Sequence, residues 1–397
     1  MKNVKFIRDS IYGNIELGGI FLELLEMPEI QRLNGIKQLG LTYLVYPGAN
    51  HTRLEHSIGT SHMARKMARV LGIDDMMVGV AALLHDIGHG PFSHTLEYLF
   101  HKRTGKSHVE IAKEMILGKR LLPDYEYDYT IKDVLSKYGI DAIEIINMIE
   151  GKGEMGQIIN GPLDADQVDY LMRDAYYTGV AYGVIDSDRI IQTMKLYDGQ
   201  IVFEKKGISA LESMLVARSL MYSSVYLHKT VRIAELMLVK AVEKAKPFDF
   251  SYMNDGELIE NLKKMGGYQK EMMLRLKYRK LFKKVISKNL NELEEKQRER
   301  LMEIDAREIE EKLDKKIGKE GYVIVDIPGK DILLSEPRLK KMDIKIFDNG
   351  IKPLNDYTPI SNALQFRSIT EWSIMVCSHE KYRNEVKKYA EKLLFEE

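Results

Sequence analysis

The feature that most restricts the fold is the apolar run from Met76 to Leu84 (MMVGVAALL), which ends directly at His85 and Asp86. The run is about half of the roughly 18 residues that suggest a membrane span, so it predicts a buried helix that ends near Gly88 or Gly90. Burying an imidazole and a carboxylate there costs free energy unless they are paired or bind a cation. Any fold of this chain must therefore give His85 and Asp86 a partner.

Helical periodicity surrounds this run. From about residue 20 to 245, apolar residues recur at helical spacing and predict a mainly α core, while Asp198-Gly199 between apolar residues predicts a short β-hairpin. Residues 270–316 carry dense charges of both signs and predict an exposed helical hairpin. The β-like segments 321–328, 342–350 and 372–378, with a closing helix, predict a smaller α+β lobe. We expect three domains: a helical core (1–245), a charged helical extension (246–316) and the α+β lobe (317–397).

Composition favours a soluble cytoplasmic protein. Lys+Arg and Asp+Glu both number 59, so net charge does not indicate nucleic acid as a partner. The single cysteine, Cys377, excludes an internal disulfide and a thiolate metal cluster. Charges interrupt the apolar stretch of the first residues, MKNVKFIRD, which is not a signal peptide pattern. We expect no membrane association, and any metal site must use His and carboxylate ligands.

Two further helices carry candidate ligands. Thr52 and Glu55 fit a capping box before a helix over 53–71, on which Arg53 and His56 share a face. A cation and an imidazole near a helix N-terminus suit a phosphate beside a metal.

Pro162 can open the second helix, which ends at Gly179 and carries Asp166. A helix beginning at Pro91 would place His94 and Glu97 on one face. Each residue also has a simpler interpretation, since a lone histidine is usually a core residue and an early aspartate usually caps a helix.

In order, His56, His85-Asp86 and Asp166 reproduce the H…HD…D pattern of the HD superfamily. The blocks IKQLGLTYLVYPGANHTRLEHSIGTSH, ALLHDIGHGPFSH and DADQVDYLMRD resemble its dNTP triphosphohydrolase branch, which includes the mammalian SAM-and-HD-domain enzyme and bacterial dGTPases. The likeness runs from about residue 7 to 232, and we expect no SAM domain before it.

The resemblance implies a mainly α HD-domain core that converts a dNTP and water into a deoxynucleoside and triphosphate. It implies one divalent metal per subunit (Mn, Mg, Fe, Ni, Co or Zn), held by His56, His85, Asp86 and Asp166. The implied catalytic residues are His94 as the leading general acid, His89, His108 and Glu97. The implied substrate contacts are Arg53, Gln38, Leu39, Gln167, Tyr170, Asp174, Arg218, Tyr222 and Tyr226.

Departures from the family pattern keep alternatives open. Gln167 stands where the mammalian enzyme has a phosphate-contacting lysine, and Glu97 where it has an aspartate. An HD phosphohydrolase acting on nucleoside monophosphates or other phosphoesters is one alternative. Another is a nucleotide-responsive assembly or nucleic-acid-binding protein that uses residues 270–316. We expect a homo-oligomer, a dimer or tetramer; a nucleotide activator stays open because Asn34 replaces an arginine of the nucleotide-activated enzyme.

Overall fold

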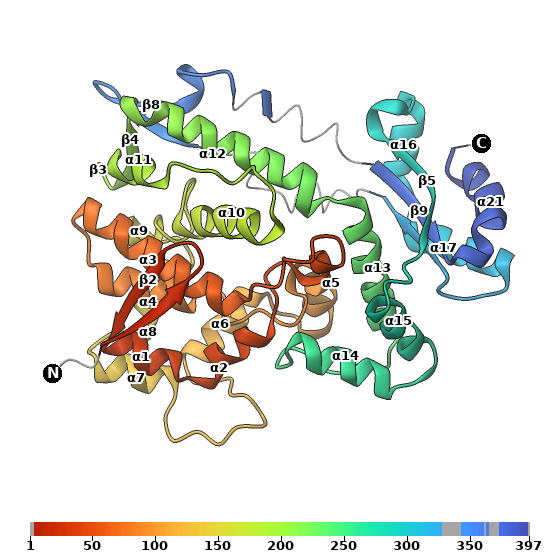
Figure 1. Cartoon of the computed structure of the whole chain (residues 1–397), viewed down its shortest axis with the longest axis horizontal. Coiled ribbons are helices and arrows are strands. Elements are labelled where there is room, and N and C mark those ends of the chain that lie inside the picture. The colour runs from red at the N-terminus through yellow and green to blue at the C-terminus, as the bar shows by residue number, and fades with distance from the viewer. Residues whose placement is uncertain (1–3, 328–342, 361–362, 365–372, 396–397) are drawn as a thin grey trace. The chain divides into compact units, whose positions relative to one another are not determined.

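The structure is a computed structural model that describes residues 4–327, 343–360, 363–364 and 373–395. Helices dominate and the sheets are small, which confirms the predicted mainly α fold with a short hairpin and a smaller α+β part (Figure 1). The chain forms two compact units. Of the described residues, unit 1 contains 4–226, 246–261 and 343–360, and unit 2 contains the others. The three-domain division stays a prediction.

Three helices form the centre of unit 1: α3 (Arg53–Leu71) packs against both α4 (Asp75–Leu84) and α10 (Ala165–Thr178). In Figure 1, α10 lies between α3 and α12 (Ile208–Met221). The apolar half of α4, from Val78 to Leu84, is entirely buried. The predicted capping box is present at Thr52 and Glu55, and Gly72 ends α3 in a left-handed conformation with φ of 70°.

Shorter helices surround this centre. The remaining α-helices of unit 1 are α1 (Ile20–Leu25), α2 (Pro28–Gln31), α5 (Ser93–Thr104), α6 (His108–Ile116), α7 (Ile131–Lys137), α8 (Ala142–Ile149), α9 (Gly153–Gly156) and α11 (Ser187–Gln192). The helix α14 (Asp255–Lys264) begins in unit 1. A π-helical turn, η4 (Tyr222–Tyr226), follows α12 and ends the first part of unit 1.

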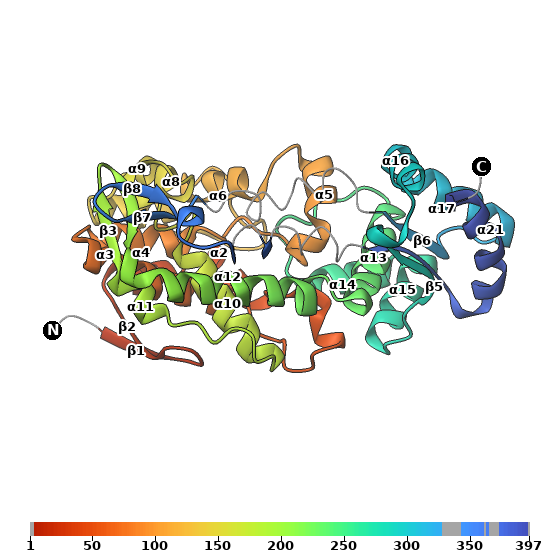
Figure 2. The same ribbon diagram turned by 90° about the horizontal axis from the view of Figure 1, so that it is seen from above.

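Two small sheets belong to unit 1. The first pairs β1 (Val4–Asp9) with β2 (Gly13–Gly18) in antiparallel register. The second contains the predicted hairpin, β3 (Met194–Tyr197) and β4 (Gln200–Glu204), whose turn places Asp198 and Gly199 at φ of 50° and 71°. This sheet is larger than the sequence analysis expects, because β7 (Lys345–Phe347) adds parallel to β4 and β8 (Ile351–Pro353) pairs with β7 (Figure 2).

Unit 2 packs helices against a three-stranded antiparallel sheet in the order β5-β9-β6. Its buried core includes Leu313 of α17, Val323 of β6 and Val376 of β9. The elements of unit 2 are α13 (Lys229–Glu243), α15 (Gly267–Lys277), β5 (Lys283–Asn289), α16 (Glu295–Glu303), α17 (Ala306–Ile317), β6 (Val323–Asp326), β9 (Ser373–Ser378) and α21 (Arg383–Phe395).

Four helix predictions need correction. α10 begins at Ala165 rather than at Pro162, because the Asp164 side chain caps it by accepting the backbone N–H of Gln167. α4 ends at Leu84 rather than near Gly88 or Gly90, because residues 85–88 continue as turns, in which the Ile87 N–H donates to the carbonyl oxygen of Leu84. α5 begins at Ser93 rather than Pro91, since Phe92 adopts a left-handed conformation with φ of 47°. The segment 270–316 is not a helical hairpin, because β5 interrupts it and pairs antiparallel with β9.

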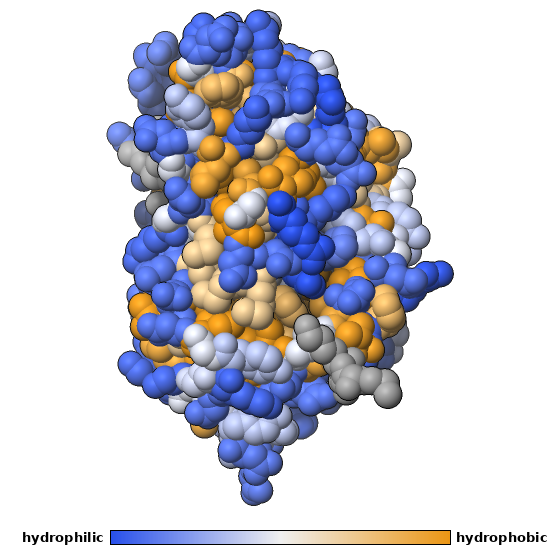
Figure 3. All heavy atoms as spheres, turned by 90° about the vertical axis from the view of Figure 1, so that its left-hand side faces the viewer, coloured by the Kyte–Doolittle hydropathy of each residue, from blue (hydrophilic) through white to orange (hydrophobic). Residues whose placement is uncertain are grey.

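Residues 328, 342 and 372, which the sequence analysis includes in β-like segments, lie outside the described residues. Within the described part of the chain, no helix is long and apolar enough to cross a membrane. On the face drawn in Figure 3, hydrophobic residues gather toward the middle and hydrophilic residues surround them.

Candidate functional site

Four side chains from three separate segments converge in unit 1. His56 lies on α3, His85 and Asp86 follow α4, and Asp166 lies in the first turn of α10. His56 Nε2 is 3.0 Å from Asp166 Oδ1 and 3.9 Å from Asp86 Oδ2. His85 Nε2 is 3.2 Å from Asp86 Oδ1 and 3.8 Å from Asp166 Oδ1. The structure therefore brings together the four residues that the sequence analysis expects as metal ligands.

Hydrogen bonds on the far side of both imidazoles decide which nitrogen faces this centre. His56 Nδ1 donates to Asp169 Oδ2 at 2.8 Å, and His85 Nδ1 donates to the carbonyl oxygen of Ala82 at 2.7 Å. A neutral imidazole carries one hydrogen, so both Nε2 atoms then present a lone pair. His85 Nε2 is buried without a hydrogen-bond partner among the described residues. Histidine binds metal ions in this arrangement.

A buried ion-pair network holds Asp169 in place. Arg173 Nε and Nη2 donate to the two carboxylate oxygens of Asp169, each at 2.9 Å, and Nη1 donates to Asp9 Oδ2 at 2.8 Å. A Cβ atom on Gly59 would lie 2.1 Å from Asp169 Oδ1, so α3 can approach this pair only because Gly59 lacks a side chain. The sequence analysis missed Asp169. The spacing of Asp169 and Arg173, four residues apart on a predicted helix, was the available signal.

The charges at the four-residue centre favour a cation. Burial alone would lower the pKa of His56, but the Asp166 and Asp169 carboxylates raise it to about 10, so His56 Nε2 offers its lone pair only when a divalent ion replaces its proton. Burial alone would raise the pKa values of Asp86 and Asp166, but neighbouring cationic groups hold both well below the usual range. One ligand atom from each of His56, His85 and Asp86 lies within 4.8 Å of the other two. These nitrogen and oxygen donors fit a divalent metal ion.

Arg53 connects this centre to a group of imidazoles. Its side chain is buried, and Nη1 donates to Asp86 Oδ2 at 2.5 Å while Nε donates to Ser93 Oγ at 2.9 Å. Its Nη2 lies 3.3 Å from His94 Nε2, and His89 Nε2 lies 3.3 Å from Asp86 Oδ1. Arg53 and His89 thus contact Asp86, and His94 lies beside Arg53. These three cationic or imidazole groups could contact the oxygens of one phosphate.

His89, Glu97 and His108 line a small pocket beside Arg53. The His89 and His108 rings stack with centroids 4.0 Å apart, and His108 Nδ1 donates to Glu97 Oε1 at 2.6 Å. A Cβ atom on Gly88 would lie 2.0 Å from the carbonyl oxygen of His108. Glycine at this position lets the segment after α4 approach the start of α6, which brings His108 to the pocket.

The imidazoles of His89 and His94 are held mainly in the neutral form. Burial and the Arg53 guanidinium lower the pKa of His89. Partial desolvation of the ring and the Arg53 guanidinium shift the pKa of His94 in the same direction. The His94 side chain is nevertheless 70% exposed, so water screens it and a ligand can reach it. His94 Nδ1 lies 4.0 Å from Glu97 Oε2, and an anionic ligand near His94 would favour its protonated form. Burial alone would raise the pKa of Glu97, but His108 lowers it to about 2.

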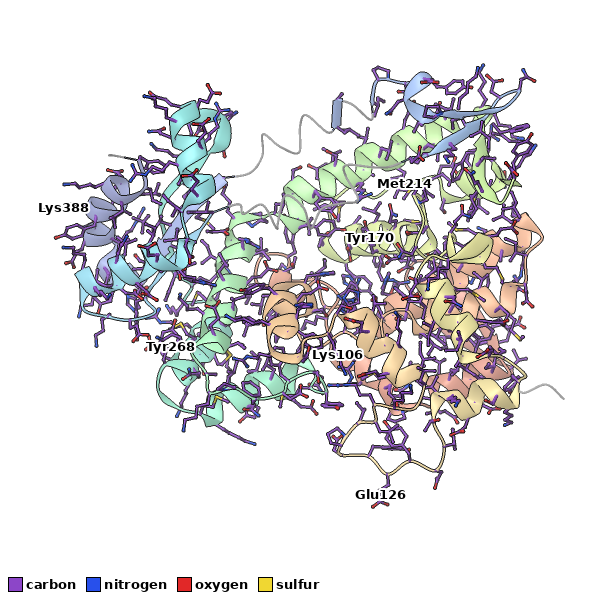
Figure 4. All side chains as sticks on the ribbon, turned by 180° about the vertical axis from the view of Figure 1, so that it is seen from behind. Lys106, Glu126, Tyr170, Met214, Tyr268 and Lys388 are labelled. Atoms are coloured by element: carbon purple, nitrogen blue, oxygen red, sulfur yellow. The ribbon has the colours of Figure 1, made fainter. Side chains whose placement is uncertain are left out.

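A second group surrounds Asp174 on α10. His51 Nε2 lies 2.7 Å from Asp174 Oδ1, and the Tyr226 hydroxyl donates to Asp174 Oδ2 at 2.7 Å. The ring of Tyr226 contacts Tyr170 and Tyr222, with centroids 6.3 Å and 5.0 Å away. Figure 4 labels Tyr170 on α10. Four predicted substrate contacts therefore lie together, with His51 as a partner that the sequence analysis missed.

The other predicted substrate contacts lie in different surroundings. Gln38 is buried, and its side-chain oxygen has no hydrogen-bond partner among the described residues, whereas Leu39 is half-buried. Arg218 Nη1 donates to Gln167 Oε1 at 3.1 Å. Gln167 Nε2 in turn donates to Asp164 Oδ2 at 3.0 Å. Gln167 is thus a neutral, buried link between α10 and Arg218 on α12.

Sequence comparisons identify two regions of the chain. The HD domain matches residues 53–174, and the HD associated region matches residues 185–395. The HD match spans all four converging residues, His56, His85, Asp86 and Asp166. The HD associated region covers more than half of the chain.

Curated relatives include an uncharacterized protein of Methanocaldococcus jannaschii, 37% identical over 99% of this chain and 84% of the relative. The human deoxynucleoside triphosphate triphosphohydrolase SAMHD1 is 29% identical over 62% of this chain and 45% of the relative. The Dictyostelium discoideum homologue of that enzyme is also 29% identical, over 73% of this chain and 60% of the relative.

Two solved structures resemble this one over nearly their whole length. A hypothetical protein from Aquifex aeolicus superposes with a TM-score of 0.75 at 29% identity, covering 98% of this chain and 100% of the other. A phosphohydrolase from Bacteroides thetaiotaomicron superposes with a TM-score of 0.72 at 27% identity, covering 95% and 100%. The chain belongs to the HD-domain superfamily of phosphohydrolases and has dNTP triphosphohydrolases among its relatives.

Proposed function

We propose that this protein is a metal-dependent dNTP triphosphohydrolase, which splits a dNTP with water into a deoxynucleoside and triphosphate. The observation that carries the proposal is the position of Arg53, which contacts both Asp86 of the metal-ligand group and His94 of the imidazole group. One phosphate group can therefore meet a divalent ion, a guanidinium and an imidazole at the same time. The relationship to dNTP triphosphohydrolases supports the same reaction.

His56, His85, Asp86 and Asp166 would hold the divalent ion, which supplies Lewis-acid activation of water and of a phosphoryl oxygen. Arg53 would stabilise negative charge that develops on the α-phosphate. The oxygen of water bonds to the α-phosphorus and gives up a proton to solvent, and the bond from that phosphorus to the 5′-oxygen breaks. His94 would give a proton to the departing 5′-oxygen, because an alkoxide is otherwise a poor leaving group.

The group around Asp174 would receive the sugar and base. His51 and Tyr226 orient the two oxygens of Asp174, so this carboxylate has a fixed position in which it can accept a hydrogen bond from a sugar hydroxyl. The partnerless side-chain oxygen of Gln38 offers another acceptor. Tyr170 and Tyr222 offer aromatic rings beside Tyr226 for contact with the nucleoside.

Product analysis tests this function. The purified full chain is incubated with each dNTP and with Mn, Mg, Ni or Co, and the phosphate products are separated by anion-exchange chromatography. We expect triphosphate and deoxynucleoside, and we expect Asp86→Ala to remove the activity. Release of orthophosphate or pyrophosphate in place of triphosphate would refute the proposal.

The bonding of Gln167 favours a second candidate, a phosphohydrolase for nucleoside monophosphates or other phosphoesters. Gln167 is neutral and its side chain is occupied by Arg218 and Asp164, so it adds no positive charge for a long phosphate chain. Turnover of nucleoside monophosphates by a protein that leaves dNTPs intact would decide for this candidate. Subunit number and a nucleotide activator stay predictions.

A further inference from the structure

Asp255 ties together two segments of unit 1 that border the proposed site. It is the first residue of α14, and its side chain is buried. Its Oδ2 accepts the backbone N–H of Lys37 at 2.9 Å, and its Oδ1 accepts the backbone N–H of Phe92 at 2.9 Å. Through these two hydrogen bonds, one carboxylate connects two stretches of backbone that are far apart in the sequence.

The first of these stretches is hydrogen-bonded to the backbone at the start of α3, which carries Arg53. Lys37 pairs with Thr52 in an isolated antiparallel bridge, and the backbone N–H of Gln38 donates to the carbonyl oxygen of His51 at 3.0 Å. The backbone N–H of Arg53 donates to the carbonyl oxygen of Ile36 at 2.9 Å. The backbone that carries Gln38 is therefore joined to the residues that begin α3.

The second stretch leads into the residues that contact the side chain of Arg53. Phe92 has φ of 47°, a left-handed conformation that is costly for an aromatic residue and persists only where surrounding contacts impose it. The next residues, Ser93 and His94, begin α5, and Ser93 Oγ accepts the Nε hydrogen of Arg53 at 2.9 Å. The bond from Phe92 to Asp255 is thus a contact that stabilises the turn presenting His94.

The segment that carries Asp255 is itself fixed to unit 1. Arg32 Nη1 donates to the carbonyl oxygen of Met253 at 3.1 Å, and Arg32 Nη2 donates to the carbonyl oxygens of Ile87 and His89. A Cβ atom on Gly35 would lie 2.8 Å from Asn254 Cβ, which shows how closely this segment approaches. The backbone that carries Asp255 is therefore packed and hydrogen-bonded against unit 1.

We propose that Asp255 is a positioning residue of this site, whose carboxylate fixes the two backbone segments that contact Arg53, one carrying Gln38 and the other carrying His94. The inference rests on the proposed function only for its effect on turnover. That Asp255 fixes the backbone amides of Lys37 and Phe92 does not depend on which substrate the site takes. Asp255 lies in a part of the chain outside the HD-domain match, which ends at residue 174.

Protonation of Asp255 should make the activity of this site depend on pH. Burial raises the pKa of this carboxyl to about 6, and the Lys37 and Phe92 amides oppose the rise. The charged and titratable groups that face it are the Lys37 ammonium, the Arg53 guanidinium and the Tyr43 hydroxyl. A protonated carboxyl keeps only one strong acceptor, so the two amides can no longer both be held. We therefore expect activity to fall as the pH drops through about 6.

The experiment compares full-length wild type with Asp255→Asn, Asp255→Glu and a matched control, Asp141→Asn. Asp141 also accepts a backbone N–H, that of Ile143 at 2.9 Å, at an exposed helix start. Amide hydrogen exchange, followed by mass spectrometry of the peptides containing Lys37 and Phe92, reads out the structural part. We expect exchange at least about 10-fold faster in Asp255→Asn and unchanged exchange in these peptides of the control.

Steady-state kinetics with a dNTP and Mn between pH 5 and 8 read out the catalytic part. At pH 7.5 we expect Asp255→Asn to lower kcat by about 10- to 100-fold and to change KM by less than about 3-fold, because misplacement of reacting groups acts on turnover. The decline of activity below about pH 6 should be absent from Asp255→Asn and present in Asp255→Glu, which retains a carboxylate.

Each outcome decides a separate claim. If Asp255→Asn has a lower melting temperature but wild-type exchange in both peptides and a wild-type pH profile, Asp255 is only a structural residue and the inference is wrong. If Asp255→Asn does not fold, Asp255→Glu carries the test: loss of the acid decline in this variant would overturn the inference. If wild type hydrolyses no dNTP, the proposed function fails, while the exchange measurements still decide whether Asp255 fixes the two amides.

Discussion

His56 Nδ1 donates to Asp169 Oδ2 at 2.8 Å, which leaves His56 Nε2 to face Asp166 and Asp86. Asp169 is fully buried and is itself held by two hydrogen bonds from Arg173. A proposed metal ligand is therefore oriented by a carboxylate that is held by a guanidinium.

Replacing Asp169 by Asn removes the carboxylate that fixes the ring of His56. We expect the affinity for Mn to fall about 10- to 100-fold, as for other residues that orient metal ligands. Titration calorimetry of the metal-free full chain measures this affinity without any substrate. Asp186→Asn, which changes an exposed helix cap on α11, is the control and should bind Mn as wild type does. Equal affinities in all three proteins would contradict the role of Asp169.

Gly59→Ala tests the same contacts through sterics. The added Cβ would lie 2.1 Å from Asp169 Oδ1 and 2.2 Å from Arg173 Nη2, so the buried pair must move. We expect a loss of roughly 2 kcal/mol or more in unfolding free energy, together with weaker Mn binding. Gly256→Ala, in the first turn of α14, is the control, because a Cβ there would come no closer than 3.3 Å to its nearest neighbour, Asn254 Oδ1. Equal unfolding free energies of the two variants in denaturant would show that α3 can shift to accommodate a Cβ at Gly59.

His94→Asn tests the proposed proton donor by changing the leaving group. With a dNTP, whose 5′-oxygen needs a proton, we expect turnover to fall about 10²- to 10⁴-fold. With a nitrophenyl phosphoester, whose leaving group departs as a stable anion, the loss should be much smaller. The ratio of the two losses, measured at one pH and one metal concentration, is the readout. Equal losses on both substrates would assign His94 to binding rather than proton transfer.

Tyr226→Phe removes the hydroxyl that donates to Asp174 Oδ2 at 2.7 Å and leaves the ring in place. A less constrained Asp174 should lower kcat/KM for dNTPs by roughly 10-fold and reduce the preference for dNTPs over rNTPs. Paired kcat/KM measurements on both nucleotide types check this. Tyr176→Phe, on an exposed tyrosine of the same helix as Asp174, should have no effect on either value. An unchanged dNTP to rNTP ratio in Tyr226→Phe would place the sugar elsewhere.

Asp314 should make the stability of unit 2 depend on pH. Its buried carboxylate accepts the backbone N–H groups of Gly321, Tyr322 and Val323, and burial raises its pKa from 3.8 to about 6. Because the folded pKa is the higher one, its stabilising contribution is complete below about pH 4 and is lost as the pH rises through about 6. The loss is of the order of 2 kcal/mol.

The stability of Asp314→Asn relative to wild type should therefore improve between pH 4.5 and pH 7, although Asn leaves one amide without an acceptor at every pH. Thermal unfolding of both proteins across this range measures the difference. Asp305→Asn, which changes the exposed cap of the same helix, should keep a constant offset from wild type. A pH-independent offset for Asp314→Asn would show that Asp314 titrates as it does in the unfolded chain.

The sequence alone determined the helices that carry the metal-ligand candidates. Thr52 and Glu55 mark the start of α3, Gly72 and Gly179 mark the ends of α3 and α10, and Asp198-Gly199 marks the hairpin. These are local signals, because a cap or a left-handed glycine depends on a few neighbouring residues. The order of His56, His85-Asp86 and Asp166 also needed no coordinates, since it is a property of the chain itself.

Tertiary structure decided the contacts that complete the site. Asp169, His51 and Asp255 contact residues far away in the sequence, and nothing in their local pattern indicates which N–H group or imidazole they meet. The early end of α4 and the left-handed Phe92 are decided in the same way, because buried partners outweigh local helix preference. Local propensity places the ligands on their helices, but only packing between distant segments fixes the direction in which each side chain points.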